Sequence, residues 1–405
     1  MNEAPAMSQP AARRPTVAVL ATTWFPGSHA DVIATRLIEG YDWQGSHRPA
    51  RVEVASVYLE QLGSRSEVWP MPDIGVDITD RNGVPRFPTV AEALGVGRPG
   101  VNVDGVVLIG EHGDYASNVF GQTLSPRRRL FDAAVSTMLG AGRLVPVFND
   151  KHLAWSYPDA CAMVDTAERL GIGLLAGSTT PLSWRVPTGT QWPLGERMDT
   201  AVVVGWGPTE RYGFHNLEAL QVHAERRAGG ESGVASVRAL TGSAARAAIA
   251  DRVVDAELLD AALGTFELTA EQVTRARASV RDVFLVEYRD GLRAEVVLCG
   301  DVLRNFGTAC RGPQHRMAGQ IWLPGAPHDH FIFLVRQIES LVQSGVAPYP
   351  VRRTLLTTGM LDAAMRSLAS GARVETPELD RAYQPVDTVA DTGVHLPRPE
   401  GVGTP

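Results

Sequence analysis

The sequence predicts an α/β protein in which a doubly wound parallel sheet is followed by an α+β domain with an open, mainly antiparallel sheet. Short apolar runs alternate with amphipathic stretches of helical length over residues 16–185, and this alternation is typical of parallel βαβ units. After residue 186 strand-like segments follow one another, and two of them are joined by Asp290-Gly291, a hairpin turn signal. The length of 405 residues is enough for two domains.

The elements of the first domain can be placed in order. Apolar runs predict five strands, at residues 16–21, 51–57, 106–109, 144–148 and 172–176. Amphipathic stretches predict three longer helices, at residues 29–40, 127–139 and 157–170. The last helix has Pro158 in its first turn and Gly171 just past its end, which is the usual asymmetry of helix ends.

The second domain is expected over residues 186–375. Its predicted strands lie at residues 201–204, 235–240, 283–288 and 292–298, and its predicted helices at residues 215–227, 244–264 and 331–344. Residues 1–15 and 376–405 are rich in proline, glycine and polar residues, which predicts a disordered N-terminal tail and a flexible C-terminal tail.

Composition limits the classes of partner. The formal net charge is −7, and no apolar run approaches the roughly 20 residues of a membrane span, so we expect neither a nucleic-acid nor a membrane partner. The three cysteines, Cys161, Cys299 and Cys310, have no metal-like spacing and form no disulfide framework. With no signal-like N-terminus, these features favour a cytoplasmic protein, and the wealth of Ala, Arg, Gly and Val favours a bacterial one.

Two predicted strands end in dense groups of polar side chains. The strand at 106–109 is followed by Glu111, His112, Asp114 and Tyr115, and the strand at 144–148 is followed by Asn149, Asp150, Lys151 and His152. Ligands of open α/β sheets bind beyond the carboxyl ends of the strands. We therefore expect both loops to line one pocket for a small-molecule substrate.

Two motifs resemble the Gfo/Idh/MocA family, named after glucose–fructose oxidoreductase, inositol dehydrogenase and a rhizopine-catabolism protein. The first is the segment 149–154 with the helix and strand that follow it, and the second is Tyr212-Gly213-Phe214-His215. The resemblance covers most of residues 16–375. It implies a Rossmann-like first domain, a substrate and oligomerisation domain after it, and a homodimer or homotetramer. Lys151 would be the lysine beside nicotinamide and substrate, and His215 the catalytic histidine of an oxidoreductase.

The chain departs from this family at several positions. Asp150 and His152 replace the family's glutamate and proline, and Arg211 replaces an aspartate before the histidine. The loop after the first strand has one glycine where dinucleotide enzymes have three. If NAD(P) binds, its contacts are expected at the end of that strand and the start of the next helix, at Thr22, Gly27, Ser28, His29 and Asp31. The loop leaves NAD(P) use open.

Several functions remain open from the sequence. In an oxidoreductase acting on a small polyhydroxylated or carbonyl-bearing metabolite, Lys151, His215, Glu111, His112 and Asp114 would be catalytic. In a metal-dependent isomerase, lyase or hydrolase, a divalent cation would bind Glu111, His112, Asp150, His152 and His215. A non-catalytic sensor on the same fold is the third possibility.

The remaining candidates have ordinary structural alternatives. Tyr115, Asn149, Trp184 and Arg185 are expected to bind substrate, but Trp184 and Arg185 would equally suit a packing pair between domains. The acidic groups after residue 110 would otherwise pair with the arginines at 127–129. His328 and His330 are expected in a solvated loop or helix cap.

Overall fold

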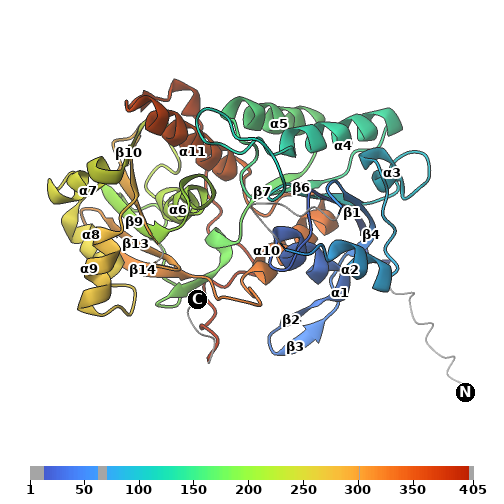
Figure 1. Cartoon of the computed structure of the whole chain (residues 1–405), viewed down its shortest axis with the longest axis horizontal. Helices are drawn as coiled ribbons and strands as arrows, with labels where there is room; N and C mark the ends of the chain where they lie inside the picture. The colour runs from blue at the N-terminus through green and yellow to red at the C-terminus, as the bar shows by residue number, and fades with distance from the viewer. Residues whose placement is uncertain (1–12, 63–70, 301, 401–405) are drawn as a thin grey trace, which may run out of the picture.

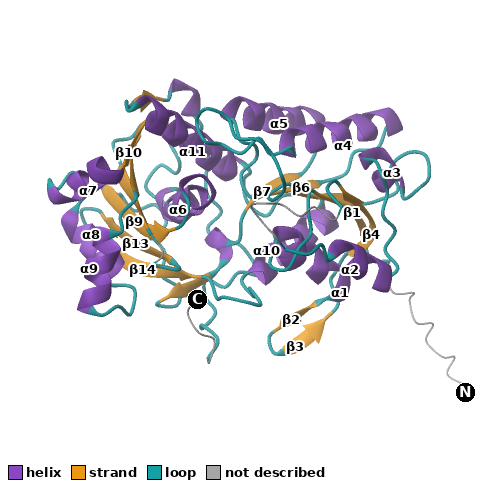
Figure 2. Cartoon of the chain, viewed as in Figure 1, coloured by secondary structure: helices purple, strands orange, loops and turns teal. Residues whose placement is uncertain are grey.

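The computed structural model describes residues 13–62, 71–300 and 302–400. Within them the chain forms two sheets that lie side by side, each covered by helices (Figures 1 and 2). The tail predicted for residues 1–15 lies almost entirely outside the described residues. In the described part of the chain, no helix is long and apolar enough to cross a membrane.

The first sheet has five parallel strands in the order β4-β1-β5-β6-β7, which confirms the predicted doubly wound parallel sheet. The strands are β1 (Thr16–Ala21), β4 (Glu53–Leu59), β5 (Gly105–Ile109), β6 (Val147–Asp150) and β7 (Leu174–Gly177). Side chains alternate between the faces of a strand, and β1 supplies Ala18 and Leu20 to one hydrophobic cluster and Val17 and Val19 to the other. The sheet is therefore buried on both faces.

Helices cover both faces of this sheet. On one face lie α3 (Val90–Gly95), α4 (Arg127–Ala141) and α5 (Tyr157–Leu170). On the other lies α10 (Phe331–Ser344), which comes late in the sequence, with the π-helical turn η1 (Asp31–Thr35) and α1 (Arg36–Glu39). The helix predicted over 29–40 spans residues 29–39, with π-helical hydrogen bonding over Asp31–Thr35. A hairpin of β2 (Tyr41–Trp43) and β3 (Ser46–Arg48) and the short helix α2 (Gly75–Arg81) complete this half.

The second sheet has eight strands in the order β15-β10-β11-β12-β9-β13-β14-β8. Only β12 and β9 at its centre are parallel, so the sheet is mainly antiparallel, as predicted. Its strands are β8 (Trp184–Val186), β9 (Thr200–Trp206), β10 (Val234–Thr241), β11 (Asp282–Tyr288), β12 (Arg293–Cys299), β13 (Phe306–Arg311), β14 (Arg316–Trp322) and β15 (Val374–Glu375).

The two faces of the second sheet have different coverings. On the face toward the first domain lie α6 (Thr209–Ala224) and α11 (Arg352–Ser370), and α11 also contacts α5 (Figure 1). On the outer face lie α7 (Gly242–Ala250), α8 (Ala256–Leu263) and α9 (Ala270–Ala278). A single helix is predicted over 244–264, but the structure divides it because Asp255 caps a new helix, its side chain accepting a hydrogen bond from the backbone N–H of Leu258 at 3.1 Å.

The C-terminal segment differs from the flexible tail that its composition predicts. Over residues 376–400 it packs on the body of the protein, with Leu379 and Tyr383 buried. The hydroxyl of Tyr383 donates to Glu225 at 2.7 Å, and Asp387 pairs with Arg226 at 2.9 Å. A few apolar and aromatic anchors thus hold a segment rich in proline and glycine against the body of the protein.

Candidate active site

The centre of the site is a buried ion triad at the ends of β5 and β6. The Nζ of Lys151 lies 2.5 Å from one carboxylate oxygen of Glu111, and the guanidinium of Arg127 lies 2.5 Å from the other. The three side chains are 3%, 5% and 1% exposed. Burial alone would raise the pKa of Glu111, but the charges of Lys151 and Arg127 outweigh it and hold that pKa well below its ordinary value. Glu111 is therefore an anion that holds the side chains of Lys151 and Arg127 in position.

Lys151 is the only lysine among the 405 residues, although the chain has 38 lysine and arginine residues in total. Its backbone has a φ of +61°, which few non-glycine residues adopt, and its N–H donates to the carbonyl of Gly177 at 3.1 Å. Arginine forms ion pairs at least as well as lysine, but it cannot release its proton. The single lysine is therefore the one basic side chain of the triad that can serve either as a cation or, after losing its proton, as a base.

His215 reaches the same place from the second domain. It lies in the second turn of α6, which begins at Thr209, six residues before the start that the sequence predicts. Its Nδ1 faces the hydroxyls of Ser178 and Thr180, at 3.1 and 3.3 Å, and a carboxylate oxygen of Glu218 at 3.3 Å. Burial lowers the pKa of His215, hydrogen bonding to Glu218 opposes this, and the charge of Lys151 lowers it further. His215 thus contacts Ser178, the residue that follows Gly177, whose carbonyl accepts the N–H of Lys151.

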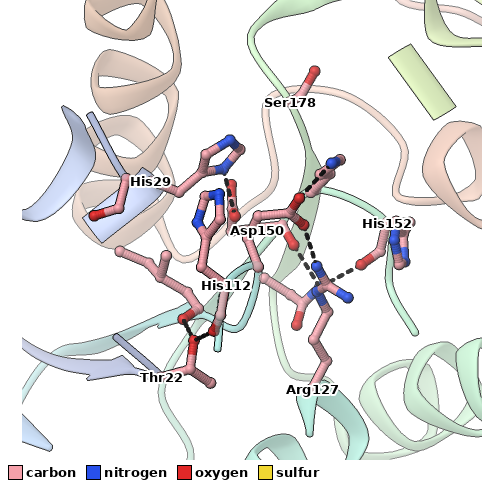
Figure 3. Close-up of polar contacts among 12 residues, drawn as sticks. Thr22, His29, His112, Arg127, Asp150, His152 and Ser178 are labelled. Atoms are coloured by element: carbon pink, nitrogen blue, oxygen red, sulfur yellow. Dashed lines mark hydrogen bonds and ion pairs between the residues drawn. The ribbon is translucent and has the colours of Figure 1, made fainter. Parts of the chain in front are cut away.

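A second imidazole–carboxylate pair lies beside the triad. The Nδ1 of His29 is 2.7 Å from a carboxylate oxygen of Asp150, and the Asp150 side chain is fully buried. The rings of His29 and His112 meet edge to face, with their centroids 5.4 Å apart (Figure 3). The other oxygen of Asp150 has no hydrogen-bond partner among the described residues. The structure thus brings together His29, His112 and Asp150, which the sequence assigns to different roles.

Comparisons with known proteins define the fold around this site. No family model and no curated protein matches the chain. Among solved structures, GenD2 from gentamicin A biosynthesis, in complex with NAD, is 16% identical, with a TM-score of 0.55 over 92% of this chain and 99% of that one. Myo-inositol 2-dehydrogenase from Lactobacillus plantarum is 12% identical, with a TM-score of 0.52 over 90% and 99%. The chain has the fold of the Gfo/Idh/MocA dehydrogenases.

A third similar structure has two small ligands besides its nucleotide. It is an oxidoreductase from Agrobacterium radiobacter in complex with NAD⁺, L-tartaric acid and magnesium, 14% identical, with a TM-score of 0.50 over 90% of this chain and 98% of that one.

The first loop of this chain does not suit a dinucleotide in the manner of that fold. The hydroxyl of Ser28 accepts hydrogen bonds from the backbone N–H groups of Phe25 and Asp31, at 3.1 and 3.3 Å, and the carboxylate of Asp31 accepts one from Gly27 at 2.9 Å. The N–H of Asp31 is one of the helix-start groups that bind an anion, and those of Phe25 and Gly27 lie in the loop just before the helix. Trp24 is fully buried against Gly75, in a loop where dinucleotide enzymes have small residues.

The predicted metal set is not brought together, which corrects that expectation. The Nδ1 of His152 lies 2.9 Å from the carbonyl of Ala154, and its ring packs on Phe214, away from the His29–Asp150 pair (Figure 3). Glu111 is engaged by the two cations of the triad. Among the described residues, no group of three or more His, Cys, Asp or Glu side chains is arranged to hold a metal ion.

Two of the predicted substrate contacts are packing residues instead. Arg185 is 1% exposed and donates to the carbonyls of Ser183 and Pro181, both at 2.7 Å. Burial, with the charges of Arg353 and Arg226, lowers the pKa of Arg185 to about 9. Trp184 packs on Trp322 and Phe333. The packing alternative is therefore the one that the structure supports for both.

The other predicted residues lie around the site without entering the triad. Tyr115 donates its hydroxyl to Glu60 at 2.9 Å, and the exposed Asp114 uses its backbone N–H to bind Gln61 at 3.0 Å. Asn149 is buried, and its amide donates to the carbonyl of His152 at 3.3 Å. These side chains shape the loops rather than face the Lys151 amine.

Sequence reasoning missed two residues of the site. Glu218 accepts hydrogen bonds from the hydroxyl and the backbone N–H of Ser178 and faces His215. Its signal was the His-x-x-Glu spacing, which puts both side chains on one helix face. His330, expected in a solvated loop or a helix cap, is the N-cap residue of α10, but it is only 5% exposed, and its Nδ1 has no hydrogen-bond partner in the described part of the chain. Burial, with the charges of His328 and Arg36, holds the pKa of His330 well below its ordinary value.

Proposed function

We propose that the protein is an enzyme that exchanges protons with a small metabolite carrying hydroxyl or carbonyl groups, and that Lys151 and His215 are its acid–base pair. The observation that carries the proposal is the buried position of the only lysine, whose backbone N–H binds Gly177 next to Ser178, the residue that contacts His215. An amine and an imidazole can each take up and release a proton, and catalytic groups of this kind contribute typically ~10²–10⁴-fold to a rate.

The electrostatics support distinct roles for the two groups. Burial and the Lys151 charge favour the neutral form of His215, so its imidazole is ready to accept a proton at neutral pH. Glu218, Ser178 and Thr180 all face its Nδ1, which fixes the ring and leaves Nε2 as the reacting atom. The Lys151 ammonium, positioned by Glu111, would then stabilise the oxygen on which negative charge develops.

The first candidate reaction is that of an oxidoreductase. Oxidation of an alcohol requires a base for the hydroxyl proton while a hydride leaves the carbon for an acceptor. The similar Lactobacillus plantarum structure is a myo-inositol 2-dehydrogenase, which supports a polyhydroxylated substrate and this reaction class. The second candidate is a proton transfer without hydride, and the bonding within the first loop favours it.

The test is conversion of a defined set of metabolites by the full-length protein. Inositols, aldoses and 2-keto sugars would be incubated with it, with and without NAD⁺ and NADP⁺, and followed by proton NMR. Lys151→Met and His215→Asn are each expected to lower the rate by ~10²-fold or more. Arg143→Met and His47→Asn, which remove exposed side chains of matching type, are expected to leave it unchanged. A rate that survives both site variants contradicts the proposal.

A further inference from the structure

We infer that the crevice beyond the parallel sheet takes no nicotinamide dinucleotide, and that the protein catalyses a redox-neutral proton transfer. The inference rests on the proposed function for its acid–base groups, but its nucleotide part stands on separate residues. Three places that a dinucleotide would need are occupied by bonds within the chain itself. They are the switch point of the sheet, the start of the first helix, and the end of β4.

The switch point lies between β1 and β5. From β1 the chain continues to β4 on one side, and from β5 it continues to β6 and β7 on the other, so the strand order reverses there. Ligands of such sheets enter the crevice at this point. Here the backbone N–H of Thr22 donates to the carbonyl of Ile109 at 3.1 Å, and its hydroxyl donates to the carbonyl of His112 (Figure 3). These two bonds tie the loop after β5 to the end of β1.

The start of the first helix is capped by the chain's own side chains. A pyrophosphate binds the unpaired N–H groups at such a helix start. In this chain the Ser28 hydroxyl accepts the N–H of Asp31 in the first turn, and Ser28 and Asp31 also accept the N–H groups of Phe25 and Gly27 in the loop before the helix. Asp31 is in addition a carboxylate, which would lie beside any phosphate and repel it. The loop is thus bonded to the carboxylate of Asp31, which has the same negative charge as the pyrophosphate that the loop would have to bind.

The end of β4, where an acidic residue would bind a ribose, is also engaged. Glu60 pairs with Arg129 at 2.6 Å and accepts the Tyr115 hydroxyl at 2.9 Å. The side-chain oxygen of Gln61 accepts the backbone N–H of Asp114 at 3.0 Å. The loop after β5 is therefore bonded across the ends of both β1 and β4, along the path that a dinucleotide takes.

The acid–base groups that remain are sufficient for a reaction without electron transfer. Each domain supplies an imidazole oriented by a carboxylate: His29 with Asp150, and His215 with Glu218. One imidazole removes the proton from the carbon next to a carbonyl, and the electron pair of that C–H bond forms an enediolate. The Lys151 ammonium stabilises the enediolate oxygen, and the other histidine, which enters the cycle as its imidazolium, returns a proton to the same carbon from the opposite side. Proton exchange with water then resets the two imidazoles. The product is an epimer of a hydroxycarbonyl metabolite, and no oxidant is consumed.

The experiment is calorimetric titration of the full-length protein with NADH and with NADPH, to millimolar concentrations. GenD2, a protein of the same fold whose structure is in complex with NAD, serves as the positive control. We expect no heat of binding for this protein with either nucleotide. Saturable binding of NADH or NADPH overturns the inference, whether or not the acid–base proposal holds.

The chemical part is tested on any substrate that the metabolite set yields. The reaction is run in D₂O with protein from which small molecules have been removed by gel filtration. We expect turnover without added nucleotide, with solvent deuterium incorporated at carbon. Turnover that depends on added NAD⁺ or NADP⁺ overturns the inference but does not contradict the proposed acid–base roles of Lys151 and His215. If neither nucleotide binds and no metabolite is converted, only the proposed function is contradicted. The inference about the nucleotide then still holds, because the titration tests it independently of turnover.

Discussion

Lys151 and Glu111 lie 2.5 Å apart at the ends of two neighbouring parallel strands, and Arg127 binds the second oxygen of the same carboxylate. One anion thus serves two cations, and all three side chains are buried. Buried charges of this kind are stable only when every partner is present. The arrangement holds the amine of Lys151 in one position, and the backbone of the same residue binds Gly177, next to the Ser178 that contacts His215.

Replacing the shared anion is expected to destabilise the fold strongly. Glu111→Gln leaves Lys151 and Arg127 buried without a counter-charge, and we expect a loss of about 3–5 kcal/mol in the free energy of unfolding, measured by urea denaturation. The matched control is Glu60→Gln, which removes a carboxylate from the half-exposed Arg129 and is expected to cost about 0–1 kcal/mol. Equal losses in the two variants would show that the triad is not buried.

The same carboxylate sets a dependence of stability on pH. The pKa of Glu111 is held well below its ordinary value of 4.5, so its contribution is complete above that value and is lost as the pH falls through the lower pKa of the folded state. The difference in unfolding free energy between the wild type and Glu111→Gln is therefore expected to shrink in acid. Urea denaturation at a series of pH values measures it, and a constant difference would be the contrary result.

A second carboxyl group has the opposite dependence on pH. Burial raises the pKa of Glu295, on β12, from 4.5 to about 7, although the backbone N–H of Asp255 donates to it. The folded state then binds a proton that the unfolded state has released, so stability falls as the pH rises from 4.5 toward 7. At pH 8 Glu295→Gln is expected to stabilise the protein by up to about 3 kcal/mol. Thermal unfolding would show this, and the exposed Glu271→Gln is the neutral control.

Gly177 is the close approach between the two domains at this site. Its φ is +123°, and an added Cβ would lie 3.0 Å from Thr354 Oγ1 and 3.2 Å from a carboxylate oxygen of Glu218. Gly177→Ala is therefore expected to cost about 1–3 kcal/mol of stability, measured by urea denaturation. Gly140→Ala, in α4 with nothing within 4 Å, is expected to stabilise the protein by about 0.5–1 kcal/mol. If Gly177→Ala left the free energy of unfolding unchanged, the contact of Gly177 with Thr354 and Glu218 would be less tight than the structure shows.

Much of the fold could be predicted because the pattern is local. The uninterrupted apolar run of β1 and the Pro158 and Gly171 ends of α5 are signals that do not depend on distant residues. The site could be predicted in part, because parallel strands end on the same edge and this places Glu111 and Lys151 together.

The rest depended on contacts between distant segments. Arg185 lies in a motif that suggests a ligand, yet its guanidinium binds carbonyls of its own turn. His330 is buried because α10, late in the sequence, covers the first sheet. No local sequence pattern predicts either outcome. Nor does such a pattern predict that the side chains of Ser28 and Asp31 accept hydrogen bonds from backbone N–H groups of the first loop.

The claim that the two domains form one acid–base site is tested most directly by the titration of His215. Its Cε1–H resonance would be assigned with His215→Asn and followed by NMR against pH, in the wild type and in Lys151→Met. The pKa of His215 is expected to rise in Lys151→Met, because a nearby positive charge that disfavours the imidazolium is removed, and to stay unchanged in Arg143→Met. An unchanged His215 pKa in Lys151→Met would show that the amine and the imidazole do not share a site.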